Sequence, residues 1–191
     1  MRPFHTTIVL LALAYAAGCS FTPSTDIWKA ASEGDVDLLK QHVDAGTDIN
    51  ETLDLPGDLG DGGSPLHIAV LNNQLTALDF LIAQGAEVDR RASNETGASP
   101  LMWAAAFGNL EAAKRLVAAG AVVNYVDNNG ATAIDAALMY EPHKHRESKA
   151  EIANLLRSKG GQSSLASKTI DDIWTAAASG TTEAIIKHLD D

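Results

Sequence analysis

Apolar residues recur at helical spacing in three stretches of the chain, and each stretch is followed by a glycine. Within a stretch the apolar positions are separated by three and then four residues, which places them on one face of a helix. The three sets are Val36, Leu39 and Val43; Leu75, Leu78 and Ile82; and Leu110, Ala113 and Val117. Gly46, Gly85 and Gly120 stand where a left-handed residue ends a helix, so three amphipathic helices are predicted.

A shorter helix is predicted ahead of each amphipathic helix. Ser64 is a suitable N-cap, and Pro65 follows it at the first helical position, where no amide partner is needed. Ser99 and Pro100 repeat this pair. Alanine pairs at 30–31 and 104–105 leave little bulk between neighbouring helices, so close packing is expected. Runs of β-branched residues with a period of two are scarce, and the expected fold class is therefore all-α.

The helix pairs recur along the chain with a nearly constant period. The segment SPLHIA at residues 64–69 returns as SPLMWA at 99–104 and more loosely as TAIDAA at 132–137. Its third position, at spacings of 39, 35, 33 and 39 residues, is held by Ile27, Leu66, Leu101, Ile134 and Ile173. A glycine lies 19 residues after each of the first three. Two features in fixed phase over three units indicate a structural repeat.

This pattern resembles the ankyrin repeat, a unit of about 33 residues with the motif T-P-L-H-x-A. The resemblance covers nearly all of the chain from Asp26 onward. It implies an all-α ankyrin-repeat solenoid of stacked helix-turn-helix units joined by hairpin-like fingers. Four repeats are expected, at residues 26–62, 63–97, 98–130 and 131–160. The first carries a long finger at 51–63, and the fourth has an insertion at 140–149 between its two helices.

The end of the chain echoes the first repeat. Residues 172–174 repeat the Asp-Ile-Trp of residues 26–28 at an offset of 146, and further matches follow at the same offset. A linker is expected at 161–169, followed by a partial fifth repeat or C-terminal cap at 170–191. The segment 170–191 is either a cap folded on the fourth repeat or the first unit of a second array. We favour the cap.

Residues 1–18 have the features of a secretory signal. Arg2 precedes an apolar run from about Thr6 to Ala17, which is too short to span a bilayer. Small residues then lead to Cys19, the one cysteine in the chain. They resemble the bacterial lipobox, and this resemblance implies cleavage before Cys19 and attachment of diacylglycerol to its thiol. The alternative is an ordinary signal peptide with an incidental cysteine.

Lipidation of Cys19 implies a short tether at 19–25 and a location on the periplasmic side of a bacterial membrane. Ser20, rather than aspartate, follows the cysteine, which favours the outer membrane of a Gram-negative cell. The formal net charge is −11. A nucleic-acid partner is therefore not expected, because phosphates require a basic surface.

Candidate catalytic and metal-binding residues are few. His67 opens a predicted helix, and the ankyrin resemblance implies a structural role for it in the turn between repeats. His143 and His145 are two residues apart and do not share a helical face, so a zinc site there is not favoured. The acidic residues of the long finger lack the spacing of a calcium loop; they are Asp54, Asp58 and Asp61.

No nucleophile triad, phosphate loop or Cys/His set is present in the sequence. We therefore expect no catalytic residue, no metal ligand, no cofactor and no small-molecule substrate. The chain is not expected to be an enzyme.

The ankyrin resemblance implies partner contacts at the finger tips and at exposed positions of the first helices. The candidate residues are Glu33, Leu71, Asn72, Glu95, Thr96, Phe107, Asn128, Asn129, Met139 and Tyr140. Four of them form an apolar track across three successive repeats, namely Leu71, Phe107, Met139 and Tyr140. The alternatives for this track are that the insertions cover it or that it packs on another copy.

The predicted function is that of an exported, lipid-anchored ankyrin-repeat protein that binds a protein partner and has no catalytic activity of its own. The alternative is the N-terminal ankyrin portion of a longer exported enzyme or of a second ankyrin array.

Overall fold

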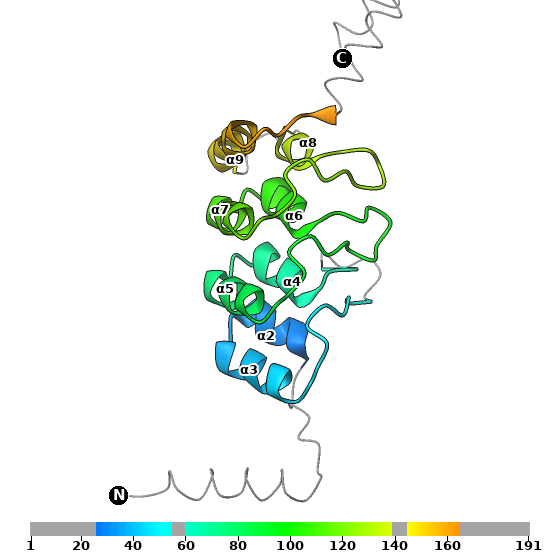
Figure 1. The fold of residues 1–191 in the computed structure, drawn as a ribbon, viewed down its shortest axis with the longest axis vertical. Coiled ribbons are helices and arrows are strands. Elements are labelled where there is room, and N and C mark those ends of the chain that lie inside the picture. The colour runs from blue at the N-terminus through cyan, green and yellow to red at the C-terminus, as the bar shows by residue number, and fades with distance from the viewer. Residues whose placement is uncertain (1–25, 55–59, 139–144, 165–191) are drawn as a thin grey trace, which may run out of the picture.

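Four helix pairs stack in sequence order along the long axis of the molecule (Figure 1). The computed structural model describes residues 26–54, 60–138 and 145–164. The pairs are α2 (Ile27–Glu33) with α3 (Val36–Asp44), α4 (Pro65–Leu71) with α5 (Leu75–Ala83), α6 (Pro100–Phe107) with α7 (Leu110–Ala118), and α8 (Ala133–Leu138) with α9 (Arg146–Ser158). Each expected repeat contains one pair, and the predicted all-α class is confirmed.

The helices form two columns. Figure 1 shows α4, α6 and α8 in one column and α5, α7 and α9 in the other, with the fingers on the side of the first column. The contacts of α2 with α4 and of α3 with α5 add α2 to the first column and α3 to the second. Within the first column, α2 packs on α4, α4 on α6, and α6 on α8. We call the helices of the first column the first helices and those of the second column the second helices.

The helix ends follow the predicted signals. Ser99 caps α6 by accepting from the Met102 N–H at 3.4 Å, and Pro100 occupies the first turn. The glycines after the second helices have φ of 79° at Gly46, 87° at Gly85 and 93° at Gly120. These values lie in the left-handed region that the helix-end pattern predicted.

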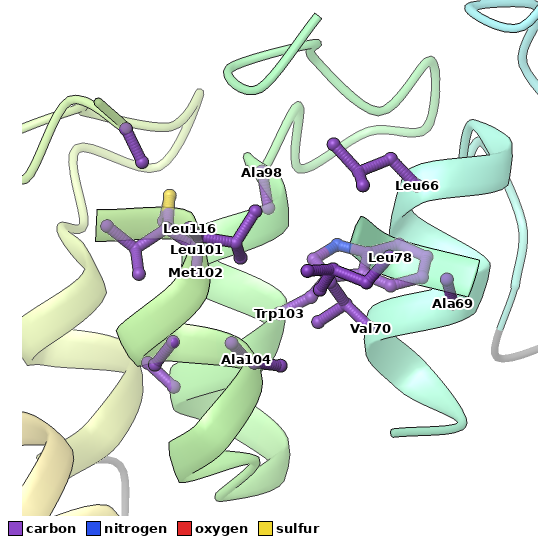
Figure 2. Close-up of a cluster of buried hydrophobic side chains, with 14 of the residues drawn as sticks. Leu66, Ala69, Val70, Leu78, Ala98, Leu101, Met102, Trp103, Ala104 and Leu116 are labelled. Atoms are coloured by element: carbon purple, nitrogen blue, oxygen red, sulfur yellow. The ribbon is translucent and has the colours of Figure 1, made fainter. Parts of the chain in front are cut away.

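The core combines small alanine side chains with larger leucine side chains. Ala30, Ala69 and Ala104 on the first helices have no exposed surface, so adjacent helices approach closely. Larger side chains such as Leu78 and Leu116 fill the space between the two columns (Figure 2). Neighbouring repeats bury apolar side chains against one another, which is why a single pair would not be stable alone.

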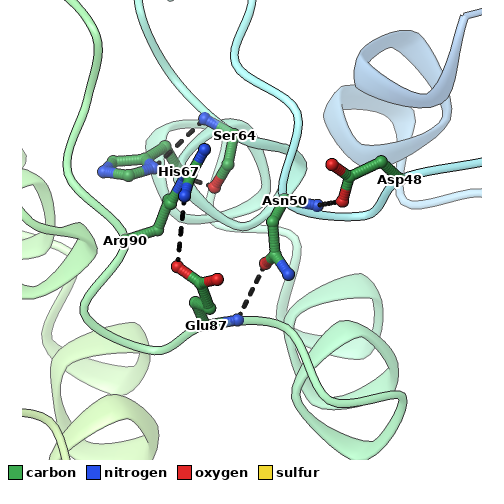
Figure 3. A network of polar contacts seen from close by, with 6 residues as sticks. All are labelled: Asp48, Asn50, Ser64, His67, Glu87 and Arg90. Atoms are coloured by element: carbon green, nitrogen blue, oxygen red, sulfur yellow. Dashed lines mark hydrogen bonds and ion pairs between the residues drawn. The ribbon is translucent and has the colours of Figure 1, made fainter.

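A regular set of hydrogen bonds connects each repeat to the next, and we call it the inter-repeat ladder. The side chain of Asn50 accepts from the Glu87 N–H at 2.8 Å (Figure 3). Asp89 accepts from the Val122 N–H at 3.0 Å. Asn124 accepts from the Gln162 N–H at 2.8 Å. Each rung lies just after the glycine that ends a second helix.

The segment after α9 is bonded to the fourth repeat. The hydroxyl oxygen of Thr132 lies 2.9 Å from the carbonyl oxygen of Gln162, and the Ser164 N–H donates to the Asp135 carboxylate at 3.0 Å. The predicted linker 161–169 therefore begins with residues that are held on the repeat stack.

Several predicted features fall outside the described residues. These are the signal and tether at 1–25, the finger segment 55–59, the insertion residues 139–144, and the segment 165–191. Cys19, Met139 and Tyr140 are among them. None of the helices in the described part of the chain is long and apolar enough to cross a membrane.

Candidate partner-binding surface

An open groove of about 760 Å³ runs along the first helices. We call it the concave groove. Its apolar lining comes from three successive repeats and consists of Trp28, Leu53, Ile68, Leu71 and Phe107. The first helices place these side chains together because α2, α4 and α6 lie side by side. An apolar groove of this size with polar edges is typical of a binding site.

The edges of the concave groove are polar. Ser32, Asn72 and Asn109 line it beside the apolar side chains. Asn109 donates from Nδ2 to the carbonyl of Val70 at 2.7 Å, across the boundary between the second and third repeats. Gln74, one repeat earlier, donates in the same way to the carbonyl of Ser32 at 3.0 Å. These amides fix the spacing of the first helices and hence the width of the groove.

Phe107 is held in the groove by its neighbours on α6. The ring of Trp103 meets Phe107 edge-on, with centroids 6.4 Å apart, and meets His67 edge-on at 4.9 Å. Gly108 follows Phe107 in the left-handed conformation, with φ of 71°. A Cβ at Gly108 would lie 2.6 Å from the Cβ of His145, which itself lines the groove. Only glycine therefore fits at the point where α6 ends beside the fourth repeat.

Trp28 brings a buried donor to this surface. Its side chain lines the groove, and its indole Nε1–H is buried without a hydrogen-bond partner among residues 26–54, 60–138 and 145–164. By the 39-residue spacing, Trp28 stands at the position that His67 occupies in the second repeat. His67 is buried at that position, whereas Trp28 lines the groove. Trp28, Leu53 and Ile68 were not among the partner-binding residues predicted from the sequence.

The predicted partner-binding residues fall into separate groups. Leu71, Asn72 and Phe107 line the concave groove together. Glu33 is exposed on α2, lies 3.9 Å from Lys29 and does not line the groove. Met139 and Tyr140, the other half of the apolar track, lie outside the described residues.

The finger-tip candidates lie away from the groove and are used to join fingers. Asn128 donates from Nδ2 to the carbonyl of Glu95 at 2.9 Å and from its N–H to the carbonyl of Thr96 at 2.9 Å. Asn129 is exposed, and its N–H donates to the Asp127 carboxylate at 2.8 Å. The structure thus gives Glu95, Thr96 and Asn128 a role in holding the second and third fingers together.

His67 is enclosed and fully hydrogen-bonded. Its Nδ1 accepts from the Ser64 N–H at 3.2 Å (Figure 3), and its Nε2 lies 3.2 Å from the carbonyl of Ala98. Because Nδ1 is an acceptor, Nε2 carries the proton and donates to Ala98. Burial lowers the pKa of His67 to about 4. The imidazole is therefore neutral at pH 7 and joins the second repeat to the third, in the structural role that the resemblance implied.

Asp135 occupies the equivalent position in the fourth repeat. Its carboxylate accepts from the N–H and hydroxyl of Thr132, each at 2.8 Å, and also from Ser163 and Ser164. Burial by itself raises the pKa of Asp135, but the hydrogen bonds from Ser163, Thr132 and Ser164 outweigh it and hold the pKa below its ordinary value. The carboxylate is therefore ionised and structural.

No group of three or more His, Cys, Asp or Glu side chains that could hold a metal ion occurs within residues 26–54, 60–138 and 145–164. The described residues of the two weighed metal candidates, such as His145 and Asp61, belong to no such group. What this part of the chain offers chemically is an apolar groove with hydrogen-bonding edges.

Comparison with known proteins places the repeats in a family. A model of ankyrin repeats in three copies matches residues 27–127, and a second ankyrin-repeat model matches residues 101–156. The chain is 34% identical over 103 residues to Palmitoyltransferase AKR1 of Kluyveromyces lactis and 33% identical over 112 residues to human Palmitoyltransferase ZDHHC13. It is also 31% identical over 114 residues to rat Ankyrin repeat and SAM domain-containing protein 6.

These matches cover 53%, 59% and 60% of this chain but only 13%, 17% and 12% of the respective relatives. The similarity thus spans a small part of each relative, and it lies where this chain has its repeats. With the repeat spacing, the stacked helix pairs and the family model in agreement, the chain belongs to the ankyrin-repeat family.

Proposed function

We propose that this chain is an exported, lipid-anchored protein that binds a protein partner in the concave groove and performs no catalysis of its own. The observation that carries the binding role is the alignment of Trp28, Leu71 and Phe107 along one groove. Aromatic side chains in a partly enclosed apolar surface supply most of the affinity in many protein interfaces. Export and lipidation are supported by the sequence of residues 1–19.

The binding role is tested with purified protein that lacks residues 1–18 and carries Cys19→Ser. Partners are captured from a periplasmic extract, identified, purified and titrated against the wild-type surface. Phe107→Glu is expected to weaken binding about thirtyfold, which corresponds to about 2 kcal/mol at a central aromatic residue. The matched control is Val126→Glu, because Val126 is 47% exposed and lies outside the groove. Equal binding by both variants would remove the groove from the proposal.

The anchoring is tested separately, by mass spectrometry of the N-terminal peptide after expression in a Gram-negative host. A mature chain that begins with diacylglyceryl-Cys19 is expected, and Cys19→Ala should remain unlipidated. A wild-type chain that is cleaved at another residue and carries no lipid would contradict the proposed lipid anchor. It would not affect the proposal that the concave groove binds a partner.

A second candidate function is that these repeats are the ankyrin portion of a longer exported enzyme. It is favoured by the palmitoyltransferases among the relatives, whose ankyrin-matching stretch is a small fraction of their length. Sequencing of the reading frame after Asp191 tests it. A catalytic domain in the same frame would support this candidate, and an immediate stop codon would exclude it.

A further inference from the structure

We propose that residues 172–190 dock on the far face of the fourth repeat as a fifth ankyrin unit. The docking surface is the side of α8 and α9 that points away from the third repeat, and we call it the end face. This inference concerns the chain's own C-terminal segment and does not depend on what the concave groove binds.

The end face exposes a leucine at a position that is buried in every preceding repeat. Leu138 follows Ile134 by four residues, as Ala31 follows Ile27, Val70 follows Leu66 and Ala105 follows Leu101. The first three equivalents have no exposed surface, whereas Leu138 is 53% exposed. The first helix of each of the first three repeats is covered by the first helix of the next repeat, whereas α8 is covered only by the preceding α6 and by no following first helix among the described residues. Leu138 therefore lies on a surface that, in the preceding repeats, is covered by the first helix of the next repeat.

The segment 172–190 carries the side chains that such a cover needs. At the offset of 146 its residues match the first repeat at five positions that are buried there. Ile27, Ala30, Ala31, Leu39 and His42 correspond to Ile173, Ala176, Ala177, Ile185 and His188. A helix pair with these side chains has an apolar face that requires a neighbouring repeat.

The connection has the length of an ordinary connection between repeats. Ile173 follows Gly160 by 13 residues, and Ile134 follows Gly120 by 14. Because Gly160 ends α9 with φ of 80°, as Gly120 ends α7 with φ of 93°, the two connections begin from the same geometry. A contiguous fifth unit therefore needs no extra chain.

The first residues of this connection are hydrogen-bonded to the third and fourth repeats. The rung from Asn124 to the Gln162 N–H continues the inter-repeat ladder beyond α9. Ser164 is then held by Asp135, as Ala98 is held by His67 two repeats earlier. The chain thus leaves the fourth repeat through the same pair of contacts by which it leaves the second.

A charge difference between the two similar units supports docking from this side. Lys29 is equivalent to Trp103, whose ring contacts His67 of the preceding repeat. This position therefore faces the preceding repeat. In the first repeat it carries an exposed lysine, and in the C-terminal unit it carries the neutral Thr175. A neutral, β-branched residue is suited to a covered position, since burying an unpaired ammonium group is costly.

Hydrogen–deuterium exchange of the purified full chain tests this docking. In the wild-type protein, amides within 172–190 should be protected, because docked helices exchange through opening of the repeat. Leu138→Asp should abolish that protection. Val126→Asp is the matched control, since Val126 is also exposed, at 47%, but belongs to the connection after α7 and to no rung of the inter-repeat ladder. Its protection pattern should equal that of the wild type.

Ala177→Asp provides the reciprocal variant, and it keeps the test decisive if Leu138→Asp disturbs α8 itself. It should abolish protection of 172–190 while α4 to α7 exchange as in the wild type. Unprotected amides at 172–190 in the wild-type protein, or protection that survives both substitutions, would overturn the docking. Protection that falls on dilution of the protein would assign the end face to a second copy and would also overturn it.

Discussion

His67 and Asp135 occupy the same position in the second and fourth repeats, and they hold the following segment with opposite hydrogen-bond polarity. His67 donates from Nε2 to the carbonyl of Ala98 at 3.2 Å. Asp135 accepts from the N–H of Ser164 at 3.0 Å. The second repeat therefore requires an acceptor in the segment that follows it, whereas the fourth requires donors.

The low pKa of His67 predicts a pH dependence of stability. Its pKa is about 4 in the folded protein, below the ordinary value of 6.5, so folding favours the neutral form. The stability that this group contributes is present above pH 6.5 and is lost as the pH falls toward 4. Between pH 7 and pH 4.5 the loss is expected to be about 2 to 3 kcal/mol, since one pKa unit corresponds to about 1.4 kcal/mol.

Urea unfolding of the wild type and of His67→Gln at both pH values measures this loss. The variant cannot titrate, so its free energy of unfolding should fall less between the two pH values by the stated amount. The carboxylates contribute equally to both proteins and cancel in the comparison. An identical pH dependence in the two proteins would show that His67 is not the group responsible.

The reversed polarity at Asp135 predicts that histidine, which serves the second repeat, fails in the fourth. In Asp135→His a ring N–H would face the donor N–H of Ser164, so the free energy of unfolding should fall by about 3 kcal/mol. Asp135→Asn keeps one carbonyl oxygen as an acceptor and should cost about 1 to 2 kcal/mol. Chemical denaturation at pH 7 ranks the two variants, and a more stable histidine variant would contradict the assigned polarity.

The same carboxylate predicts a further loss of stability in acid. Its pKa is held below the ordinary aspartate value, so its contribution is present above about pH 4 and is lost as the pH falls below that. Asp135→Asn should lack this component. The measurement is thermal unfolding of both proteins from pH 5 to pH 2.5, compared by the change in melting temperature.

Gly108 is predicted to tolerate alanine less well than Gly120. Both have positive φ, at 71° and 93°, so both substitutions carry the backbone cost of about 1 kcal/mol. At Gly108 the new methyl group would also lie 2.6 Å from the Cβ of His145, whereas at Gly120 it meets nothing within 4 Å. Gly108→Ala should therefore lower the free energy of unfolding by at least about 1 kcal/mol more than Gly120→Ala.

Equilibrium denaturation of the two glycine variants is the direct comparison. Equal losses of stability would mean that α6 and the start of α9 move apart at no cost.

Asn109 is predicted to stabilise the spacing of the first helices. Its Nδ2 donates across repeats to the carbonyl of Val70 at 2.7 Å, so Asn109→Ala should cost about 1 kcal/mol. The matched variant is Asn72→Ala, because Asn72 is exposed and donates to Ile68 within its own helix. Asn72→Ala should cost less, as measured by thermal unfolding, and a larger loss there would contradict a cross-repeat role for Asn109.

Most of the fold could be predicted because its signals are local and periodic. The Ser-Pro pairs, the apolar spacing and the helix-ending glycines each act within a few residues, and each is where it was expected in the structure. Repetition then determines the stacking, because every unit repeats the same interface with the next. The fold class required no contact that is specific to this chain.

The surface was predicted less completely because it depends on departures from the repeat. Leu71 and Phe107 were expected in the groove, and both line it. Trp28 was missed; its equivalents in later repeats, His67 and Met102, are buried rather than part of the groove. The role of Asp135 was also not predicted, because its donors lie 28 and 29 residues further along the chain. Comparison with the repeat motif registers Asp135 only as a mismatch to the histidine at this position, and it does not indicate that the carboxylate accepts hydrogen bonds where His67 donates one.

The inter-repeat ladder determines how the stack responds to tension. Each rung joins a side chain of one repeat to the backbone of the next, and no described rung spans three repeats. Pulling on the two ends should therefore release units in succession from an end rather than rupture the whole body at once. Each released unit of about 33 residues would add about 110 Å of contour length, since an extended residue spans about 3.4 Å. Under tension the molecule would therefore lengthen in steps, one repeat at a time, as an extensible spacer.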